Sequence, residues 1–86
     1  MCMTDYVKER TQSMERDAAD KVALLTDVVK SLIELEQRAR QLPRSAGVVA
    51  LLLGARANFI AEQAAAFRVI EECNAIQREM REVGDK

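Results

Sequence analysis

Apolar residues recur at steps of three and four along both halves of the chain. The first half carries this pattern at Val7, Thr11, Met14, Ala18, Lys21, Leu25, Val28, Leu32, Leu35, Ala39 and Leu42. The second half repeats it at Val48, Leu52, Ala55, Phe59, Glu62, Ala66, Val69, Cys73, Ile76, Met80 and Val83. Such heptad spacing places all members of a set on one side of an α-helix. The pattern therefore predicts two long helices that pack on each other through these positions.

One segment interrupts the helical pattern. Residues 42–47 hold Pro43, the only proline of the chain, and Gly47. Proline lacks the backbone N–H that a helix interior needs, so a turn is expected there. We predict a first helix over about residues 4–41, a turn over 42–47 and a second helix over about 48–83. Because a short turn folds the helices back on each other, the expected fold is all-α: an antiparallel two-helix hairpin forming a single domain over residues 1–86.

The second helix carries a second apolar stripe beside the first. Its members are Val49, Leu53, Ile60, Ala64, Phe67 and Ile70. Only one stripe can face the first helix, so the other is expected to stay exposed unless another chain covers it. Burial of one large apolar side chain is worth roughly 1.5 to 3 kcal/mol before ordering costs. We therefore expect a helical partner, or self-association when the protein is alone, to complete the hairpin to a bundle. The candidate partner-binding residues are Val49, Leu52, Leu53, Phe59, Ile60, Phe67 and Ile70.

Lys21 and Glu62 are the charged members of the two heptad patterns. One hypothesis is that they pair across the hairpin and set its register. The alternative is that each side chain extends to the edge of the helix–helix interface and keeps its charge in water. We favour the alternative, because a turn near Arg44 would place Lys21 closer to Phe67 than to Glu62.

Composition argues against several classes of function. The 13 basic and 14 acidic residues are interleaved and leave a net charge of −1, whereas a nucleic-acid-binding protein usually shows a basic patch. The longest apolar run, residues 48–55, is shorter than the roughly 20 residues of a membrane span. Histidine is absent, which removes the usual general base and the commonest metal ligand. We therefore predict no enzyme activity, no cofactor, no metal site, and no nucleic-acid or membrane binding.

The two cysteines, Cys2 and Cys73, lie near opposite ends of the chain, without a disulfide framework or a signal peptide. A reducing cytoplasm is the expected location. In a hairpin both residues would lie toward the open end, so the geometry permits a disulfide between them.

Residues 48–67 read VVALLLGARANFIAEQAAAF. Together with the charged heptad helix before it and the single turn, this segment resembles the E-type co-chaperones of the needle subunit of bacterial type III secretion. The resemblance is architectural and covers most of the hairpin. It implies a cytoplasmic hairpin that packs on a helical-repeat co-chaperone and helps to keep the needle subunit soluble and unpolymerised. The chain extends the family pattern by charged helix over about residues 74–86.

Two functions follow as expectations. The first is a cytoplasmic chaperone, co-chaperone or adaptor that binds a helical protein, with a type III secretion needle subunit as one candidate. The alternative is a self-associating structural or regulatory protein that forms a dimeric four-helix bundle.

Overall fold

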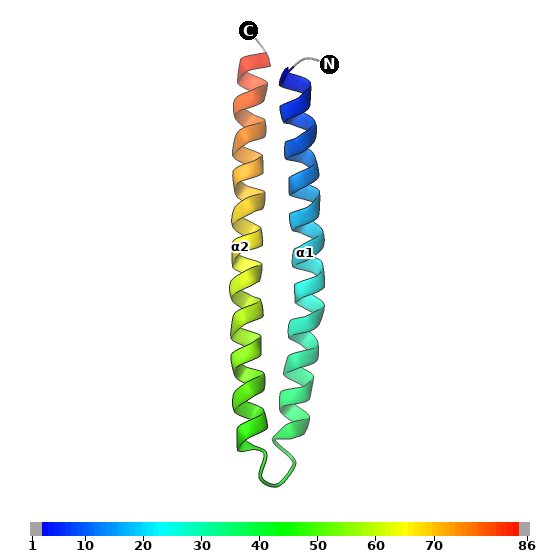
Figure 1. Ribbon diagram of the computed structural model, residues 1–86, viewed down its shortest axis with the longest axis vertical. Helices are drawn as coiled ribbons and strands as arrows, with labels where there is room; N and C mark the ends of the chain where they lie inside the picture. Colours follow the sequence, from blue (N-terminus) through cyan, green and yellow to red (C-terminus); the bar gives the residue numbers. More distant parts are fainter. Residues whose placement is uncertain (1–2, 85–86) are drawn as a thin grey trace.

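The computed structural model describes residues 3–84 and contains two long helices. Helix α1 spans Met3–Ala39 and helix α2 spans Ala46–Gly84. They lie side by side and antiparallel, with the connection at one end and both ends of the described chain at the other (Figure 1). The predicted all-α hairpin is confirmed.

The turn is displaced by about two residues toward the N-terminus from its predicted place. Helix α1 ends at Ala39, where the N–H groups of Gln41 and Leu42 bond back to the carbonyls of Arg38 and Ala39 at 3.1 and 3.0 Å. Arg44 has a φ of 58°, the left-handed conformation, which reverses the chain directly before α2. The Ser45 carbonyl then accepts the Val49 N–H at 2.9 Å and opens the second helix.

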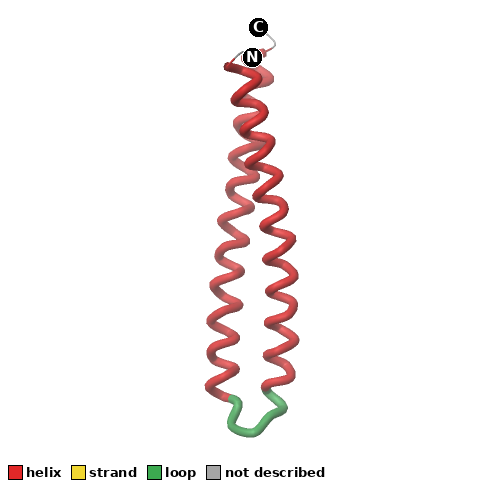
Figure 2. Tube along the Cα trace, turned by 45° about the vertical axis from the view of Figure 1, so that its right-hand side comes forward, coloured by secondary structure: helices red, strands yellow, loops and turns green. Residues whose placement is uncertain are grey.

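The hairpin is an elongated rod with principal dimensions of 67 × 16 × 13 Å (Figure 2). Its radius of gyration is 19.3 Å, against about 12 Å for a compact domain of this length. Its accessible surface of 6709 Å² exceeds by about 1,600 Å² the value expected for a compact monomer of 9.6 kDa. Two helices without a third layer therefore leave much more surface in water than a globular domain does.

The helix–helix interface, called the seam below, alternates steps of three and four on both helices. Each of its members is buried or half-buried. On α1 they are Thr11, Glu15, Ala18, Val22, Leu25, Val29, Leu32, Glu36 and Ala39. On α2 they are Val49, Leu52, Arg56, Phe59, Gln63, Ala66, Ile70, Cys73, Gln77 and Met80.

The predicted seams were therefore right at every second position and wrong by one residue at the others. Thr11, Ala18 and Leu25 lie in the seam as predicted, but their alternates on α1 are Glu15, Val22 and Glu36 rather than Met14, Lys21 and Leu35. On α2 the same rotation replaces Val48, Ala55, Glu62, Val69 and Ile76 by their C-terminal neighbours. The physical reason is that several polar side chains are satisfied across the seam, so hydrophobicity alone selects the wrong stripe.

Candidate protein-binding faces

Within residues 3–84, three polar contacts join the helices at intervals along the seam. Near the turn, Arg56 Nη1 lies 3.1 Å from Glu36 Oε2. In the middle, the Gln63 amide donates to Thr26 Oγ1 at 2.7 Å, and that hydroxyl donates to the Val22 carbonyl at 2.8 Å. Toward the open end, the Gln77 amide donates to Glu15 Oε2 at 2.6 Å. Each contact requires specific partners at a specific level, so together they define the register of the hairpin.

Glu36 is the most connected of these polar groups. Its Oε1 accepts from Arg40 Nη2 at 2.8 Å and from Arg40 Nε at 3.2 Å, while its Oε2 faces Arg56. The carboxylate is buried, and the two guanidinium groups that surround it reach toward water. A carboxylate held this way keeps all its interactions only in one alignment of the helices.

Small side chains occupy four further seam positions. Ala18, Ala39, Ala66 and Cys73 are all buried, and the register places Ala18 across from Cys73. Cys73 is a free thiol and 1 % exposed. Burial raises the pKa of the Cys73 thiol above its ordinary value of 9.0, and the charges of Glu15 and Glu72 raise it further. Cys2, the other half of the disulfide considered above, lies outside the described residues.

Cys73 should resist thiol reagents while the hairpin is folded. In a Cys2→Ser background, we expect its reaction with a disulfide reagent at pH 8 to be at least about tenfold slower than in denaturant, because both access and thiolate formation are suppressed. Because the folded pKa lies above the unfolded one, the thiol's contribution to stability is complete below pH 9 and is lost as the pH rises through the folded pKa. Cys73→Ala should lack this alkaline loss, and equal reaction rates in the folded and denatured protein would contradict the burial of the thiol.

Because polar and small residues occupy ten of the 19 seam positions, most large apolar side chains of the hairpin point elsewhere. In an antiparallel pair, equivalent heptad positions of the two helices lie on the same side. One side of the seam is flanked by a row of residues from each helix, with Leu24 and Leu51 at the margins. The row on α1 consists of Val7, Met14, Lys21, Val28 and Leu35. The row on α2 consists of Val48, Ala55, Glu62, Val69, Ile76 and Val83. We call this surface the broad face. The large apolar residues exposed on it range from 40 % exposed for Ile76 to 76 % for Leu51.

The opposite side of the seam carries a smaller apolar surface, the short face. It consists of Ile33 of α1 and Leu53, Ile60 and Phe67 of α2. Ile60 and Phe67 are about half exposed, whereas Ile33 and Leu53 are half-buried. Ala57 and Ala64 lie along its outer edge, so another helix can approach closely there.

The seven candidate partner-binding residues divide between the seam and the short face. Val49 is buried in the seam, and Leu52, Phe59 and Ile70 are half-buried there, so these four contact the hairpin's own first helix. Leu53, Ile60 and Phe67 lie together on the short face. The broad face was not recognised as a surface, because its residues were assigned to the seam. The signal that separates the two is the polar series Glu15, Glu36, Arg56, Gln63 and Gln77, whose members share a heptad position on each helix.

Lys21 and Glu62 are both exposed on the broad face. The ion pairs found within residues 3–84 join Glu36 to Arg40 and to Arg56, and neither involves Lys21 or Glu62. The register is therefore set by other residues than these two.

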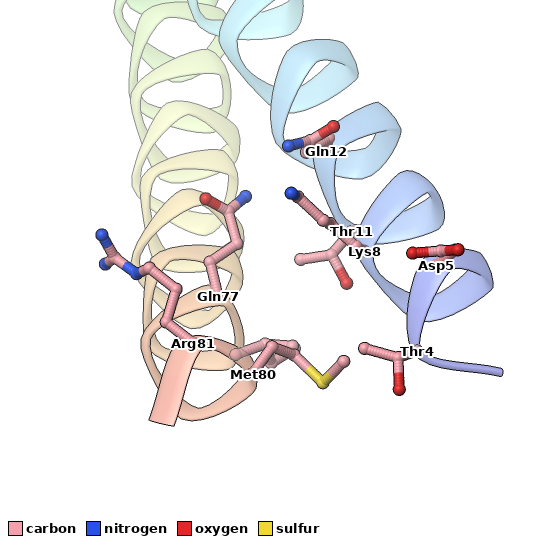
Figure 3. Close-up of a pocket in the computed structure, with 9 residues that line it drawn as sticks. Thr4, Asp5, Lys8, Thr11, Gln12, Gln77, Met80 and Arg81 are labelled. Carbon is pink, nitrogen blue, oxygen red and sulfur yellow. The ribbon is translucent and has the colours of Figure 1, made fainter. Parts of the chain in front are cut away.

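An open hollow of about 480 Å³ lies between the helix ends farthest from the turn (Figure 3). Its lining comes from the first turns of α1, including Thr4, Lys8 and Thr11, and from the last turns of α2, including Gln77 and Met80. Thr11 donates its hydroxyl to the Val7 carbonyl at 2.7 Å. The side chains of Thr11 and Thr4 are short, so the hollow reflects incomplete filling between the helices rather than converging ligand groups.

Helix α2 is long and apolar enough to cross a membrane, by length and composition, with a mean hydropathy of 1.2 over its best 18-residue window. Length and composition alone are weak support for a membrane-spanning helix, because core helices of water-soluble bundles pass the same test. The α1 helix that runs beside it exposes Asp20, Asp27 and Glu34, which would be costly in hydrocarbon. The absence of membrane binding therefore stays a prediction.

Within residues 3–84 no three His, Cys, Asp or Glu side chains gather as metal ligands would. No family model matches the chain, and neither the curated proteins nor the solved structures include a match.

Proposed function

We propose that the protein is a helix-binding adaptor whose short face receives an amphipathic helix of another protein. One observation supports this most directly: Ile60 and Phe67 remain about half exposed, side by side on one surface, although the hairpin is fully formed. Their spacing of seven residues is that of an apolar stripe ready to pack against another helix. Burial of both side chains by a partner would be worth a few kcal/mol before ordering costs.

A chaperone or co-chaperone of a type III secretion needle subunit is the specific form of this proposal that the family resemblance implies. The resemblance implies that the needle subunit is kept soluble and unpolymerised, and an apolar face on a rigid hairpin is suited to cover an amphipathic helix. In this form of the proposal the protein is cytoplasmic, has no catalytic role and acts together with a helical-repeat co-chaperone.

The test of the adaptor role compares two substitutions that add the same charge to the same helix. Phe67→Glu places a carboxylate on the short face, whereas Ala61→Glu places one on the exposed outer surface of α2. Proteins captured by the wild-type chain from its own cells would be purified and titrated against all three chains. We expect Phe67→Glu to weaken their binding by about tenfold or more, and Ala61→Glu to leave it unchanged.

Equal binding by Phe67→Glu and the wild type would show that the short face is not the binding surface. For the secretion-specific form, purified needle subunit and helical-repeat co-chaperone would be mixed with the chain and passed over a sizing column. If the chain failed to co-elute with the needle subunit and the co-chaperone, the secretion-specific role would be rejected. The titration of Phe67→Glu would then still test the general adaptor role.

A further inference from the structure

We propose that a second copy of this chain covers the broad face, lying antiparallel to the first, so that two hairpins form a four-helix bundle in which Lys21 of each copy meets Glu62 of the other. This interface uses a different surface from the adaptor role and does not depend on it. It leaves Ile60 and Phe67 on the outside of the bundle.

The placement of the two charges on the broad face is the first reason. Among the eleven positions that flank the seam on this side, Lys21 and Glu62 are the charged ones, one of each sign and on different helices. Val7 marks the open end of the face, and Lys21 lies 14 residues from it along α1. Val48 marks the turn end of the face, and Glu62 lies 14 residues from it along α2. A twofold that turns the second copy end for end places α1 against α1 and α2 against α2. Each lysine then arrives at the level of the other copy's glutamate, which lies on the diagonally opposite helix, so the two side chains meet across the middle of the interface.

This match depends on the antiparallel arrangement. Within one hairpin, the register places Glu62 near the level of Val28, one heptad from Lys21, which is about 10 Å along the rod. Two copies packed in parallel keep that offset, and both charges would then enter an apolar interface unpaired. Unpaired buried charges are strongly unfavourable, so the antiparallel arrangement is selected.

The apolar residues are complementary in the same arrangement. Leu35 and Ala55 of one copy come to the same height along the rod as Met14 and Ile76 of the other. Val48 comes to the height of Val7 and Val83. Each copy thus contributes one and the same surface to a twofold interface, as a closed dimer requires.

The area available is what a stable dimer needs. The broad face is about 50 Å long, for 35 residues of helix, and the hairpin is 16 Å wide. Its coverage would bury about 800 Å² per copy, the size of a standard specific interface. The surface that the single hairpin exposes beyond that of a compact monomer is larger than this.

Charge reversal tests the pairing. Light scattering and sedimentation of the full chain should give the mass of a dimer at micromolar concentration. Lys21→Glu alone and Glu62→Lys alone should each weaken the dimer by about tenfold or more, because each places like charges together, and the double reversal should restore it. Neither single change removes an ion pair within the hairpin, so helicity should persist. Lys30→Glu, an equal charge change off the face, should leave the dimer intact.

The orientation needs a separate measurement. A spin label at Gln41→Cys, in a Cys2→Ser background, marks the turn of each copy. The antiparallel dimer separates the two labels by about 50 Å, whereas a parallel dimer brings them within about 30 Å. A folded wild-type monomer at 100 µM, a dimer that both single reversals leave intact, or a short label distance would each overturn the proposal. These outcomes do not involve Phe67, so they are distinguishable from a failure of the adaptor role.

Discussion

Replacing Leu25 with Ala should destabilise the hairpin by about 3 kcal/mol, the largest effect that we expect from any single truncation. Leu25 is 5 % exposed in the middle of the seam, where the register places it opposite Ala66. The opposing side chain is already small and cannot expand into the cavity that the substitution leaves. A two-helix domain of this size has only a few kcal/mol of stability in its own core, so much of the population should unfold.

The neighbouring residue supplies a matched control. Leu24 is the same residue type on the same helix but is 65 % exposed, at the margin of the broad face. In the monomeric hairpin, at a protein concentration too low for dimers to form, Leu24→Ala should change the free energy of unfolding by less than about 1 kcal/mol. Denaturant titration followed by circular dichroism measures both values. An equal loss for the two variants would mean that α1 is rotated about its axis relative to the arrangement described.

Replacing Glu36 with Ala should cost about 2 kcal/mol. The substitution removes the carboxylate from between Arg40 and Arg56 and leaves two positive charges near each other at the turn end of the seam. Loss of one member of a fully buried pair costs about 3 to 5 kcal/mol. The expected value is lower because the Arg56 side chain is 33 % exposed and water can still reach it.

Glu34→Ala, two residues earlier on the exposed side of α1, is the control and should be nearly neutral. The double replacement Glu36→Leu with Arg56→Leu should recover the lost stability, because an apolar pair needs no desolvation of charge. Denaturant titration again gives the values. If Glu36→Ala and Glu34→Ala proved equally mild, the Glu36 contacts would not stabilise the hairpin.

The elements of the fold were predictable from the sequence, because helix-favouring residues and heptad spacing run unbroken on both sides of Pro43. The turn was misplaced by about two residues. The reason is that Arg44, and not a glycine, adopts the left-handed conformation, and no residue pattern marks an arginine for that role.

The division of surfaces was harder to predict. Leu53, Ile60 and Phe67 were correctly grouped on one side of α2, but Val49 and Ile70, which were predicted to belong to the same stripe, lie in the seam. A helix with apolar residues at four heptad positions allows several rotations of nearly equal apolar burial. The choice among them depends on which polar residues find partners, such as Gln63 with Thr26 and Gln77 with Glu15, and those partners are 37 and 62 residues apart in the chain.

The closed turn at one end and the two chain ends at the other have a mechanical consequence. A load applied through the ends of α1 and α2 acts across the rod rather than along it (Figure 1). The helices would then peel apart one level at a time, starting at the level of Thr11 and Met80 and reaching Glu36 and Arg56 near the turn last. Tension on a molecule of this shape would therefore be resisted by one contact at a time, whereas a rod pulled from opposite ends would resist with its whole length.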